Sequence, residues 1–354
     1  MKRILALALI LLIALGLFGC AKAPEEIAFE NITESSVPEN KKVMLCISQV
    51  DHPLHRIVQY GFIMKAKELN MIPYISGLEG HAYPYTENIE QYKKDIEQID
   101  PDGIVFFTGD DSCYDLMKEL KKQGKFVITT FFSHNFDTTK EFIDVTIPLN
   151  DSAIASVAAE YIVDKLEKQG ITEGSIGESS HFSNLYNDKE TGLNTTLYND
   201  ILRNTITKFK VLPPVTEGVS EEQSVPEIVE YINNNPDMVA AIGTSTASAM
   251  YWNEAINATG RTDIEIICID VTPLNIEYTG KTIDALISRP LYESGEQSII
   301  TLSELFNNKV FNNTPENWTV ELHPKVVCYS DKNNNDFAKE LELLNNAQEY
   351  FVEE

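Results

Sequence analysis

Two segments of the 354-residue chain share one order of features. The first, residues 101–132, starts with Pro-Asp and continues through an apolar run, a polar loop, an amphipathic stretch, a glycine and a second apolar run. Residues 236–270 repeat that order from their own Pro-Asp. Strand-length apolar runs that alternate with helical patterns are typical of parallel sheets covered by helices. The chain is therefore predicted to contain two α/β units of the same kind.

The same alternation begins near residue 42. Residues 42–48 predict a strand, residues 55–70 a helix and residues 71–76 a second strand. Residues 185–193, LYNDKETGL, are expected to form a helix with a central glycine, as are residues 52–62. A chain of this length is too long for one ordinary domain and suits two.

Polar and aromatic side chains follow many of the predicted strands. Parallel α/β sheets bind ligands at the carboxyl ends of their strands, where loops and helix N-termini converge. Two such units facing one another would surround a ligand with these side chains. They are Asp51, His52, Thr108, Asp110, Phe131, Phe132, His181, Thr244, Ser245, Thr246 and Asp270.

Charge and motifs exclude several kinds of function. A net charge of -26 argues against a nucleic-acid partner and indicates a well-solvated surface. The sequence contains no dinucleotide fingerprint, P-loop, nucleophile elbow or zincin motif. His134 and His181 are possible general bases, but nothing places a nucleophile beside either of them. We therefore expect a protein that is not an enzyme and needs no cofactor.

Four cysteines lie beyond the first twenty residues, at positions 46, 113, 268 and 328. None belongs to a CxxC pair, and three lie within apolar runs. Buried free thiols are therefore expected, in preference to a disulfide framework or a metal site.

The N-terminus has the pattern of an export signal. Lys2 and Arg3 precede an apolar segment of signal-peptide length, which ends in LFGC. This ending resembles the bacterial lipobox, so residues 1–19 are predicted to be a lipoprotein signal peptide, with Cys20 carrying the lipid. The alternative is an uncleaved signal anchor. Residues 20–41 then form the lipidated cysteine and an acidic tether that holds the protein at a membrane surface.

The most specific stretch is residues 257–295, NATGRTDIEIICIDVTPLNIEYTGKTIDALISRPLYESG. It resembles the type I periplasmic binding proteins, the sugar-binding group of ABC transporter solute receptors typified by the ribose-binding protein. Shorter segments, NMIPYIS, DIEQIDPDGIVFF, LKKQGKFVITT and LNDSAIASVAAEYIVDKL, are similar to family segments as well. The resemblance covers about residues 42–330.

The resemblance implies two Rossmann-like α/β lobes with parallel sheets, joined by a three-crossover hinge that closes over a solute. The expected crossovers lie near residues 148–150, 288–290 and 323–325. The N-terminal lobe would comprise residues 42–148 plus 290–323, and the C-terminal lobe residues 149–289 plus 324–330. Residues 331–354 are expected to be a helical extension.

Two residues match the family's binding pattern. Asp270 matches the ligand-binding aspartate, which can accept hydrogen bonds from two neighbouring sugar hydroxyls. The alternative role is to organise the Asp-Val-Thr-Pro turn. Arg289 matches a polar position at the last hinge. It could bind the hydroxyls or an acidic group of the ligand, or it could pair with a carboxylate across the hinge.

Other positions depart from the family. Ser245 and Thr246 stand where sugar binders carry Asn-Asp, and helix capping is their alternative role. His52, Leu54 and His55 replace a loop that usually carries two stacking aromatic rings. Hydrogen bonding by one imidazole is expected there rather than metal binding, since no further His or Cys cluster supports a metal.

The largest departure is at Phe131 and Phe132, which replace an Asp-Arg pair. They could stack on the ligand, accept a less polar solute or be core residues. Lys189 replaces an arginine, keeping the charge and losing the bidentate fork. Thr108 and Asp110 complete the predicted ligand-binding set.

Together these features predict a monomeric, extracytoplasmic lipoprotein that captures a small solute in an interlobe cleft. The solute is expected to be a sugar or sugar derivative, and the partner an ABC transporter permease. The alternative is a sensor with the same fold that presents its ligand to a membrane kinase or chemoreceptor.

Overall fold

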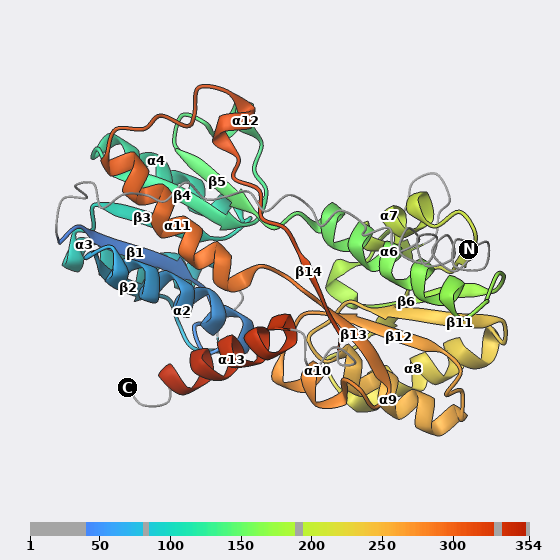
Figure 1. The fold of residues 1–354 in the computed structure, drawn as a ribbon. Coiled ribbons are helices and arrows are strands. Elements are labelled where there is room, and N and C mark those ends of the chain that lie inside the picture. Colours follow the sequence, from blue (N-terminus) through green and yellow to red (C-terminus); the bar gives the residue numbers. More distant parts are fainter. Residues whose placement is uncertain (1–39, 81–84, 188–193, 329–334, 352–354) are drawn as a thin grey trace, which may run out of the picture. The chain divides into compact units, whose positions relative to one another are not determined.

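The structure is a computed structural model that describes residues 40–80, 85–187, 194–328 and 335–351 (Figure 1). All of them belong to one compact unit, Val37–Glu354. The predicted signal peptide, the predicted lipidation site Cys20 and the predicted ligand contact Lys189 lie outside the described residues. Within the described part of the chain, no helix is both long and apolar enough to cross a membrane.

The first sheet has five strands, all parallel, in the order β2-β1-β3-β4-β5. Its strands are β1 (Lys42–Ile47), β2 (Ile72–Ser76), β3 (Gly103–Phe107), β4 (Phe126–Phe131) and β5 (Val145–Pro148). Alternate side chains of a strand point to opposite faces, so a central strand covered on both sides has to be apolar throughout. β1 meets this requirement, because five of its six residues are buried.

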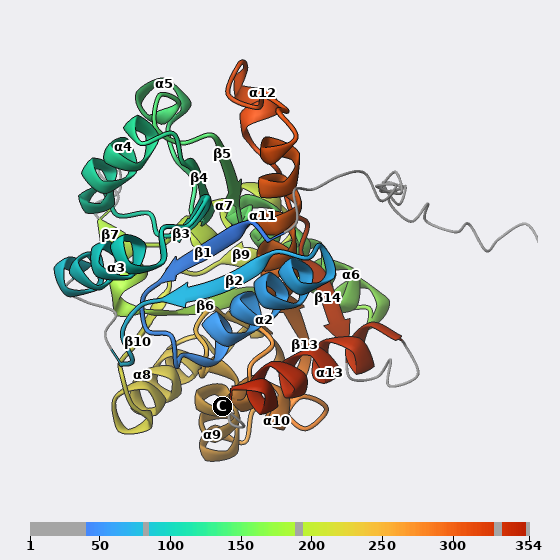
Figure 2. The same ribbon diagram turned by 90° about the vertical axis from the view of Figure 1, so that its left-hand side faces the viewer.

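Helices cover both faces of this sheet (Figures 1 and 2). Val43 and Leu45 pack in the cluster that contains the apolar faces of α2 (Pro53–Glu68) and α11 (Leu291–Phe306). Met44 and Cys46 pack on the other side, with α3 (Tyr85–Ile99) and α4 (Tyr114–Lys122). The alternation along β1 thus builds two apolar layers.

The second sheet follows the same plan with seven strands. Its order is β10-β6-β11-β12-β13-β14, with β9 also paired to β6, and β14 is antiparallel to β13. The strands are β6 (Ser175–His181), β9 (Lys210–Val211), β10 (Val215–Glu217), β11 (Met238–Gly243), β12 (Glu265–Ile269), β13 (Ile283–Ser288) and β14 (Lys325–Cys328). Its helices are α6 (Asp151–Lys168), α7 (Leu197–Thr205), α8 (Glu221–Asn234), α9 (Ser248–Thr259) and α10 (Pro273–Tyr278).

The smaller elements lie between these or follow them. They are the 3₁₀ turns η1 (Asp111–Cys113) and η2 (Phe182–Asn184), the short strands β7 (Tyr186–Asn187) and β8 (Asn194–Thr195), the helices α5 (Phe136–Thr139) and α12 (Pro315–Trp318), and the long helix α13 (Asn335–Tyr350).

The repeated module seen in the sequence is confirmed. The first copy forms β3, α4 and β4, and the second forms β11, α9 and β12. Each helix is followed by a glycine in the left-handed region, Gly124 at φ 79° and Gly260 at φ 71°. Glycine ends a helix readily there because it carries no Cβ.

The helix predicted for residues 185–193 is wrong where the structure describes it. Tyr186–Asn187 forms β7, which pairs with β8 in an antiparallel ladder. The helix starts later, at Leu197, because the Thr196 hydroxyl accepts a 2.9 Å hydrogen bond from the backbone N–H of Asn199. This cap fixes the start of α7. The rest of the segment, residues 188–193, lies outside the described residues.

The chain passes between the two sheets three times. After β5 of the first sheet it enters α6, and after β13 of the second sheet it enters α11, which packs on α2. It returns along residues that form isolated bridges to Thr146 and Leu149, and β14 then pairs with β13. α13 follows, as expected for a helical extension.

Helix α13 contacts both α2 and β14 (Figure 2). Gln348 donates a 3.2 Å hydrogen bond to the carbonyl of Pro53, and Lys67 donates a 2.8 Å bond to the Tyr350 hydroxyl. Nearer its start, Glu340 accepts a 2.9 Å bond from the Ser288 hydroxyl. The extension is thus packed against the protein through these polar contacts and through Leu344 and Ala347, which are buried in the apolar core.

Helices α2 and α11 approach unusually closely, which gives a test of this packing. A Cβ at Gly295 would lie 2.1 Å from the Val58 carbonyl oxygen. We expect Gly295→Ala to lower the free energy of unfolding by about 1–3 kcal/mol, because the two backbones have to separate. Urea denaturation measures this cost. The half-buried Gln297→Ala on the same helix is the control, and equal stability of both variants would contradict the close contact.

Candidate ligand-binding site

Asp270 directly follows β12, as predicted. Its side chain is buried, with 2% of the residue exposed, and its backbone lies in the left-handed region at φ 77°. The backbone N–H of Asp270 donates a 3.0 Å hydrogen bond to Ile287 on the neighbouring strand. The following turn is capped by Thr272, whose hydroxyl accepts a bond from the Asn275 N–H. The Asp270 carbonyl accepts a 3.0 Å bond from the Asn275 side chain, so the backbone of Asp270 takes part in this turn together with Thr272. The Asp270 carboxylate is engaged elsewhere.

The partner of the Asp270 carboxylate is Arg289, which follows β13. Its Nε lies 3.0 Å from Asp270 Oδ1, and both side chains are largely buried. The two atoms are close enough for an ion pair, but neither has a hydrogen-bond partner among the described residues. Arg289 thus pairs with a carboxylate that follows the neighbouring strand of its own sheet. A buried polar atom without a hydrogen bond is costly, so this pair is poised to accept further partners.

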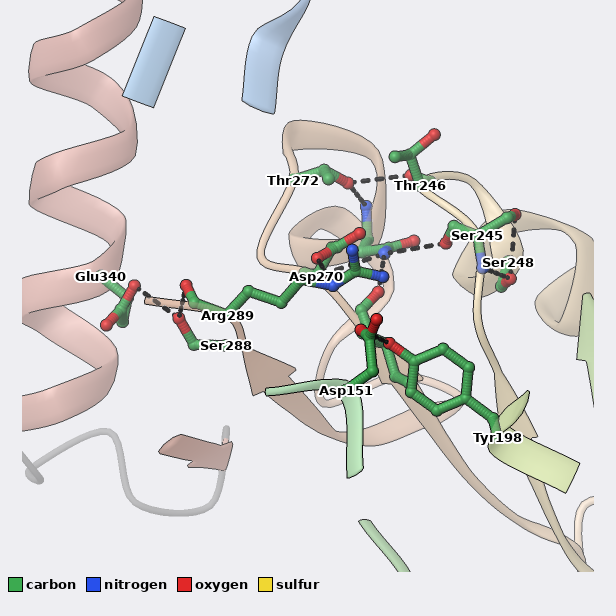
Figure 3. Close-up of polar contacts among 12 residues, drawn as sticks. Asp151, Tyr198, Ser245, Thr246, Ser248, Asp270, Thr272, Ser288, Arg289 and Glu340 are labelled. Carbon is green, nitrogen blue, oxygen red and sulfur yellow. Dashed lines mark hydrogen bonds and ion pairs between the residues drawn. The ribbon is translucent and has the colours of Figure 1, made fainter. Parts of the chain in front are cut away.

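Two residues from other elements extend this pair (Figure 3). Asp151 begins α6, and its Oδ1 accepts a 2.7 Å hydrogen bond from the Tyr198 hydroxyl of α7. Burial raises the pKa of Asp270, with Arg289 opposing and Asp151 adding to the rise. Burial also disfavours the Arg289 guanidinium, but Asp270, Tyr198 and Asp151 outweigh it and raise its pKa. The sequence reasoning missed Asp151 and Tyr198, because only the packing of α6 and α7 brings them here.

The Asp270–Arg289 pair can be tested by a double-mutant cycle. Asp270→Asn leaves a buried cation without its partner and should lower the free energy of unfolding by about 3 kcal/mol. The double variant Asp270→Asn/Arg289→Met should cost clearly less than the sum of the two single changes, because both charges are gone. Chemical denaturation of the four proteins gives the coupling. Additive costs would show that the two side chains do not interact.

Ser245 and Thr246 follow β11 and do not cap α9. The N-cap residue is Ala247, and it makes no side-chain cap. Instead the Ser245 hydroxyl donates to the Glu217 carboxylate, and the Thr246 carbonyl accepts a 2.9 Å bond from the Thr272 hydroxyl. The alternative role in helix capping is therefore wrong. The reason is that a buried carboxylate competes for the serine.

Glu217, the last residue of β10, is fully buried and was not predicted from the sequence. Its carboxylate accepts hydrogen bonds from Ser179, Ser245 and Ser248, the last at 2.7 Å. Burial raises its pKa, and these three hydroxyls oppose the rise. Glu217 thereby positions the loop that carries the predicted contacts. A carboxylate at a strand end was the signal that could have identified it.

His52 and His55 lie at the start of α2. His52 Nδ1 accepts a 3.2 Å bond from the Leu54 N–H and so caps the helix. His55 Nδ1 lies 2.7 Å from the Ser48 carbonyl, which makes it the protonated nitrogen of a neutral ring. Burial lowers the pKa of both, that of His55 to about 4. Leu54 is buried in the apolar core.

Phe131 and Phe132 stand at the end of β4, next to Phe107 at the end of β3. The ring centroid of Phe131 is 4.5 Å from that of Phe107 and 4.8 Å from that of Phe132. Both residues are half-buried and pack against the core with one side. The guanidinium carbon of Arg289 lies 5.9 Å from the Phe131 ring centroid. Phe131 is therefore the contact between the aromatic residues and the Asp270–Arg289 pair.

Thr108 and Asp110 hold the loop after β3. The Thr108 hydroxyl accepts a 3.0 Å bond from the Asp110 N–H, and Asp110 Oδ1 accepts a 2.8 Å bond from the Ser112 N–H. His134 is bound to the same loop, with Nε2 3.1 Å from the Thr108 carbonyl. These side chains shape the loop locally.

The described cysteines are free thiols, as expected. Cys46, Cys113 and Cys268 are buried, whereas Cys328 is half-buried. Within the described ranges, no group of three His, Cys, Asp or Glu side chains could hold a metal ion.

A second buried glutamate, Glu178 on β6, lies apart from these contacts. It accepts a 2.6 Å bond from the Thr196 hydroxyl, while its Oε2 has no hydrogen-bond partner among the described residues. Burial raises its pKa to about 7, against the opposing bonds from Thr196 and Asn199. The folded protein therefore holds a proton that the unfolded chain releases at lower pH.

The raised pKa of Glu178 predicts how the free energy of unfolding changes with pH. Between pH 4.5, near the ordinary pKa, and about pH 7, the unfolding free energy should fall as pH rises. Glu178→Gln should remove this loss and make the protein more stable at pH 8, by at most about 3 kcal/mol, with little change at pH 4. Urea denaturation at both pH values measures it. The exposed Glu173→Gln is the control, and a variant with the wild-type pH profile would contradict the assignment.

No protein-family model and no curated protein matches the sequence. Solved structures match in fold. AraP, an arabinose binding protein from Geobacillus stearothermophilus, matches with a TM-score of 0.67 at 16% identity, over 83% of this chain and 98% of its own. GanP, a glucose-galactose binding protein from the same organism, matches with a TM-score of 0.62 at 17% identity, over 83% of this chain and 99% of its own. A periplasmic ribose ABC transporter from Conexibacter woesei matches with a TM-score of 0.66 at 15% identity, over 82% of this chain and 93% of its own. The fold of the chain is thus that of type I periplasmic binding proteins, as its sequence resemblance implied.

Proposed function

We propose that the protein is an extracytoplasmic solute-binding lipoprotein that captures a sugar or sugar derivative and delivers it to an ABC transporter permease. One observation carries this proposal. The buried Asp270–Arg289 pair, at the carboxyl ends of two parallel strands, leaves Oδ1 and Nε without hydrogen-bond partners among the described residues. A sugar hydroxyl can donate to the first and accept from the second.

The fold supports this function. Solved structures that share it are described as a glucose-galactose binding protein, an arabinose binding protein and a periplasmic ribose ABC transporter. A binding protein needs no catalytic group, and ligand capture itself can drive a shift between two states of the hinge. The proposed lobes are residues 42–148 plus 290–323 and residues 149–289 plus 324–330.

The proposed site has a polar and an aromatic part. Asp270 and Arg289 bind hydroxyls directly, with Ser245 and Thr246 nearby on the loop after β11. The aromatic part comprises His52, His55, Phe131 and Phe132, with Leu54 beneath and Thr108 and Asp110 supporting the adjoining loop. Lys189 remains a proposed contact.

The proposed location follows from the N-terminal sequence. Cleavage before Cys20 and lipidation of its thiol would anchor a monomer to the cell membrane, with residues 21–41 as the tether. A sensor would carry the same site, and nothing in the described structure favours that role over transport.

A thermal-shift screen tests the proposed function. A sugar present at one hundred times its Kd should stabilise the folded protein by about 2.7 kcal/mol and raise Tm by roughly 5 °C. The same sugar should give no shift with Asp270→Asn, which changes the carboxylate and little else in volume. Glu173→Gln should respond like the wild type. If no neutral sugar, polyol or sugar derivative shifts Tm, the proposed function is wrong.

A further inference from the structure

The two repeated modules carry opposite chemistry at one equivalent position. Phe131 ends β4 and Asp270 follows β12, and both have a backbone φ of 77°. Each residue is also hydrogen-bonded to the neighbouring strand or to the residue that follows that strand. The Phe131 carbonyl accepts a bond from the Leu149 N–H, and the Asp270 N–H donates to the Ile287 carbonyl. One module therefore presents a carboxylate where the other presents a phenyl ring.

A phenylalanine in the left-handed region is unfavourable. Asp and Asn tolerate positive φ much better than bulky residues, so the local backbone by itself would favour Asp at position 131 as well. Strained residues of this kind concentrate at functional sites. The ring at Phe131 is thus retained against a local cost.

The ring belongs to a continuous series of aromatic contacts. His52 and His55 have ring centroids 4.9 Å apart, and His55 lies 4.8 Å from Phe107. Phe107 in turn contacts Phe131 and Phe132. Gly109 makes room for the last ring, since a Cβ there would lie 3.0 Å from it. The two imidazoles are held neutral by burial, so the series carries little charge.

Several hydrogen-bonding groups beside these rings already have local partners. His52 Nδ1 caps α2, His55 Nδ1 is bonded to backbone carbonyls, and Asp110 caps η1. Two of the three buried side-chain atoms that lack a hydrogen-bond partner among the described residues, Asp270 Oδ1 and Arg289 Nε, lie on the other side of Phe131, and the third belongs to Glu178. The site is therefore polar at one end and apolar at the other.

The contacts of Arg289 disfavour an acidic ligand. Its guanidinium is already paired with Asp270, and Asp151 also acts on it. A ligand carboxylate would have to compete with these two side chains for the guanidinium.

From this arrangement we infer that the preferred ligand is a neutral deoxysugar, with neighbouring hydroxyls on Asp270 and Arg289 and its deoxygenated end against Phe131, Phe132 and Phe107. This inference rests on the proposed function. Apolar C–H groups of a sugar gain by packing on aromatic rings, whereas a hydroxyl buried there without a partner loses its hydrogen bonds to water.

Isothermal titration with matched sugar pairs tests it. Each pair differs in one hydroxyl: D-galactose and D-fucose, L-galactose and L-fucose, L-mannose and L-rhamnose. We expect the deoxy member of the best-bound pair to bind at least about tenfold more tightly than its parent. Galacturonic acid should bind more weakly than galactose. A parent hexose that binds as tightly as its deoxy form, or a uronic acid that binds best, would overturn the inference.

A substitution at the strained position provides the second arm. Phe131→Asp fits the left-handed backbone and supplies an acceptor, so it should reverse the preference toward the parent hexose. Phe131→Leu keeps an apolar side chain and should retain the deoxy preference. An unchanged preference in Phe131→Asp, with its circular dichroism spectrum intact, would also count against the inference. If that variant does not fold, the wild-type pairs still decide. Absence of binding by every sugar would contradict the proposed function instead.

Discussion

In a parallel sheet covered by helices on both faces, the ends of the strands are where polar side chains can most readily meet a ligand. β12 illustrates the constraint, since it runs between β11 and β13 and its last four residues are buried. The first residue after it is Asp270, still only 2% exposed. A carboxylate at that depth requires a cation or several donors. Arg289 at the end of the adjacent strand supplies the cation, and the register of β12 with β13 brings the two together.

The rest of the site is arranged around this pair. The buried Glu217 carboxylate accepts hydrogen bonds from the hydroxyls of Ser245 and Ser248 and so holds the loop after β11 in place. Asp151 and Tyr198 form a further bonded pair beside Arg289. On the other side, Phe131 contacts the guanidinium and connects it to the aromatic rings. Each end of the site is thus specified by a different kind of interaction, electrostatic at one and dispersive at the other.

Much of the fold could be predicted, because it depends on local patterns. Apolar runs that alternate with helical patterns identified the strands, and Gly124 and Gly260 marked the ends of the two repeated helices. The resemblance at residues 257–295 indicated the fold family. The failure at residues 185–193 has a local cause as well: Thr196 caps the helix eleven residues after the predicted start. The alternative helix-capping role of Ser245 failed for a non-local reason, since Glu217, which accepts its hydrogen bond, comes from another strand.

The sequence by itself determined that two α/β modules exist, that polar residues collect at their strand ends, and that Asp270 stands at one of them. These properties depend on residues that are close together in the chain, and their spacing can be read directly from the amino-acid sequence. Only the tertiary structure decided that Arg289 is engaged by Asp270, that Asp151 and Tyr198 join them, and that Phe131 shares the backbone conformation of Asp270. Pairing between distant strands sets those contacts, and no local pattern encodes which side chain a buried charge will find.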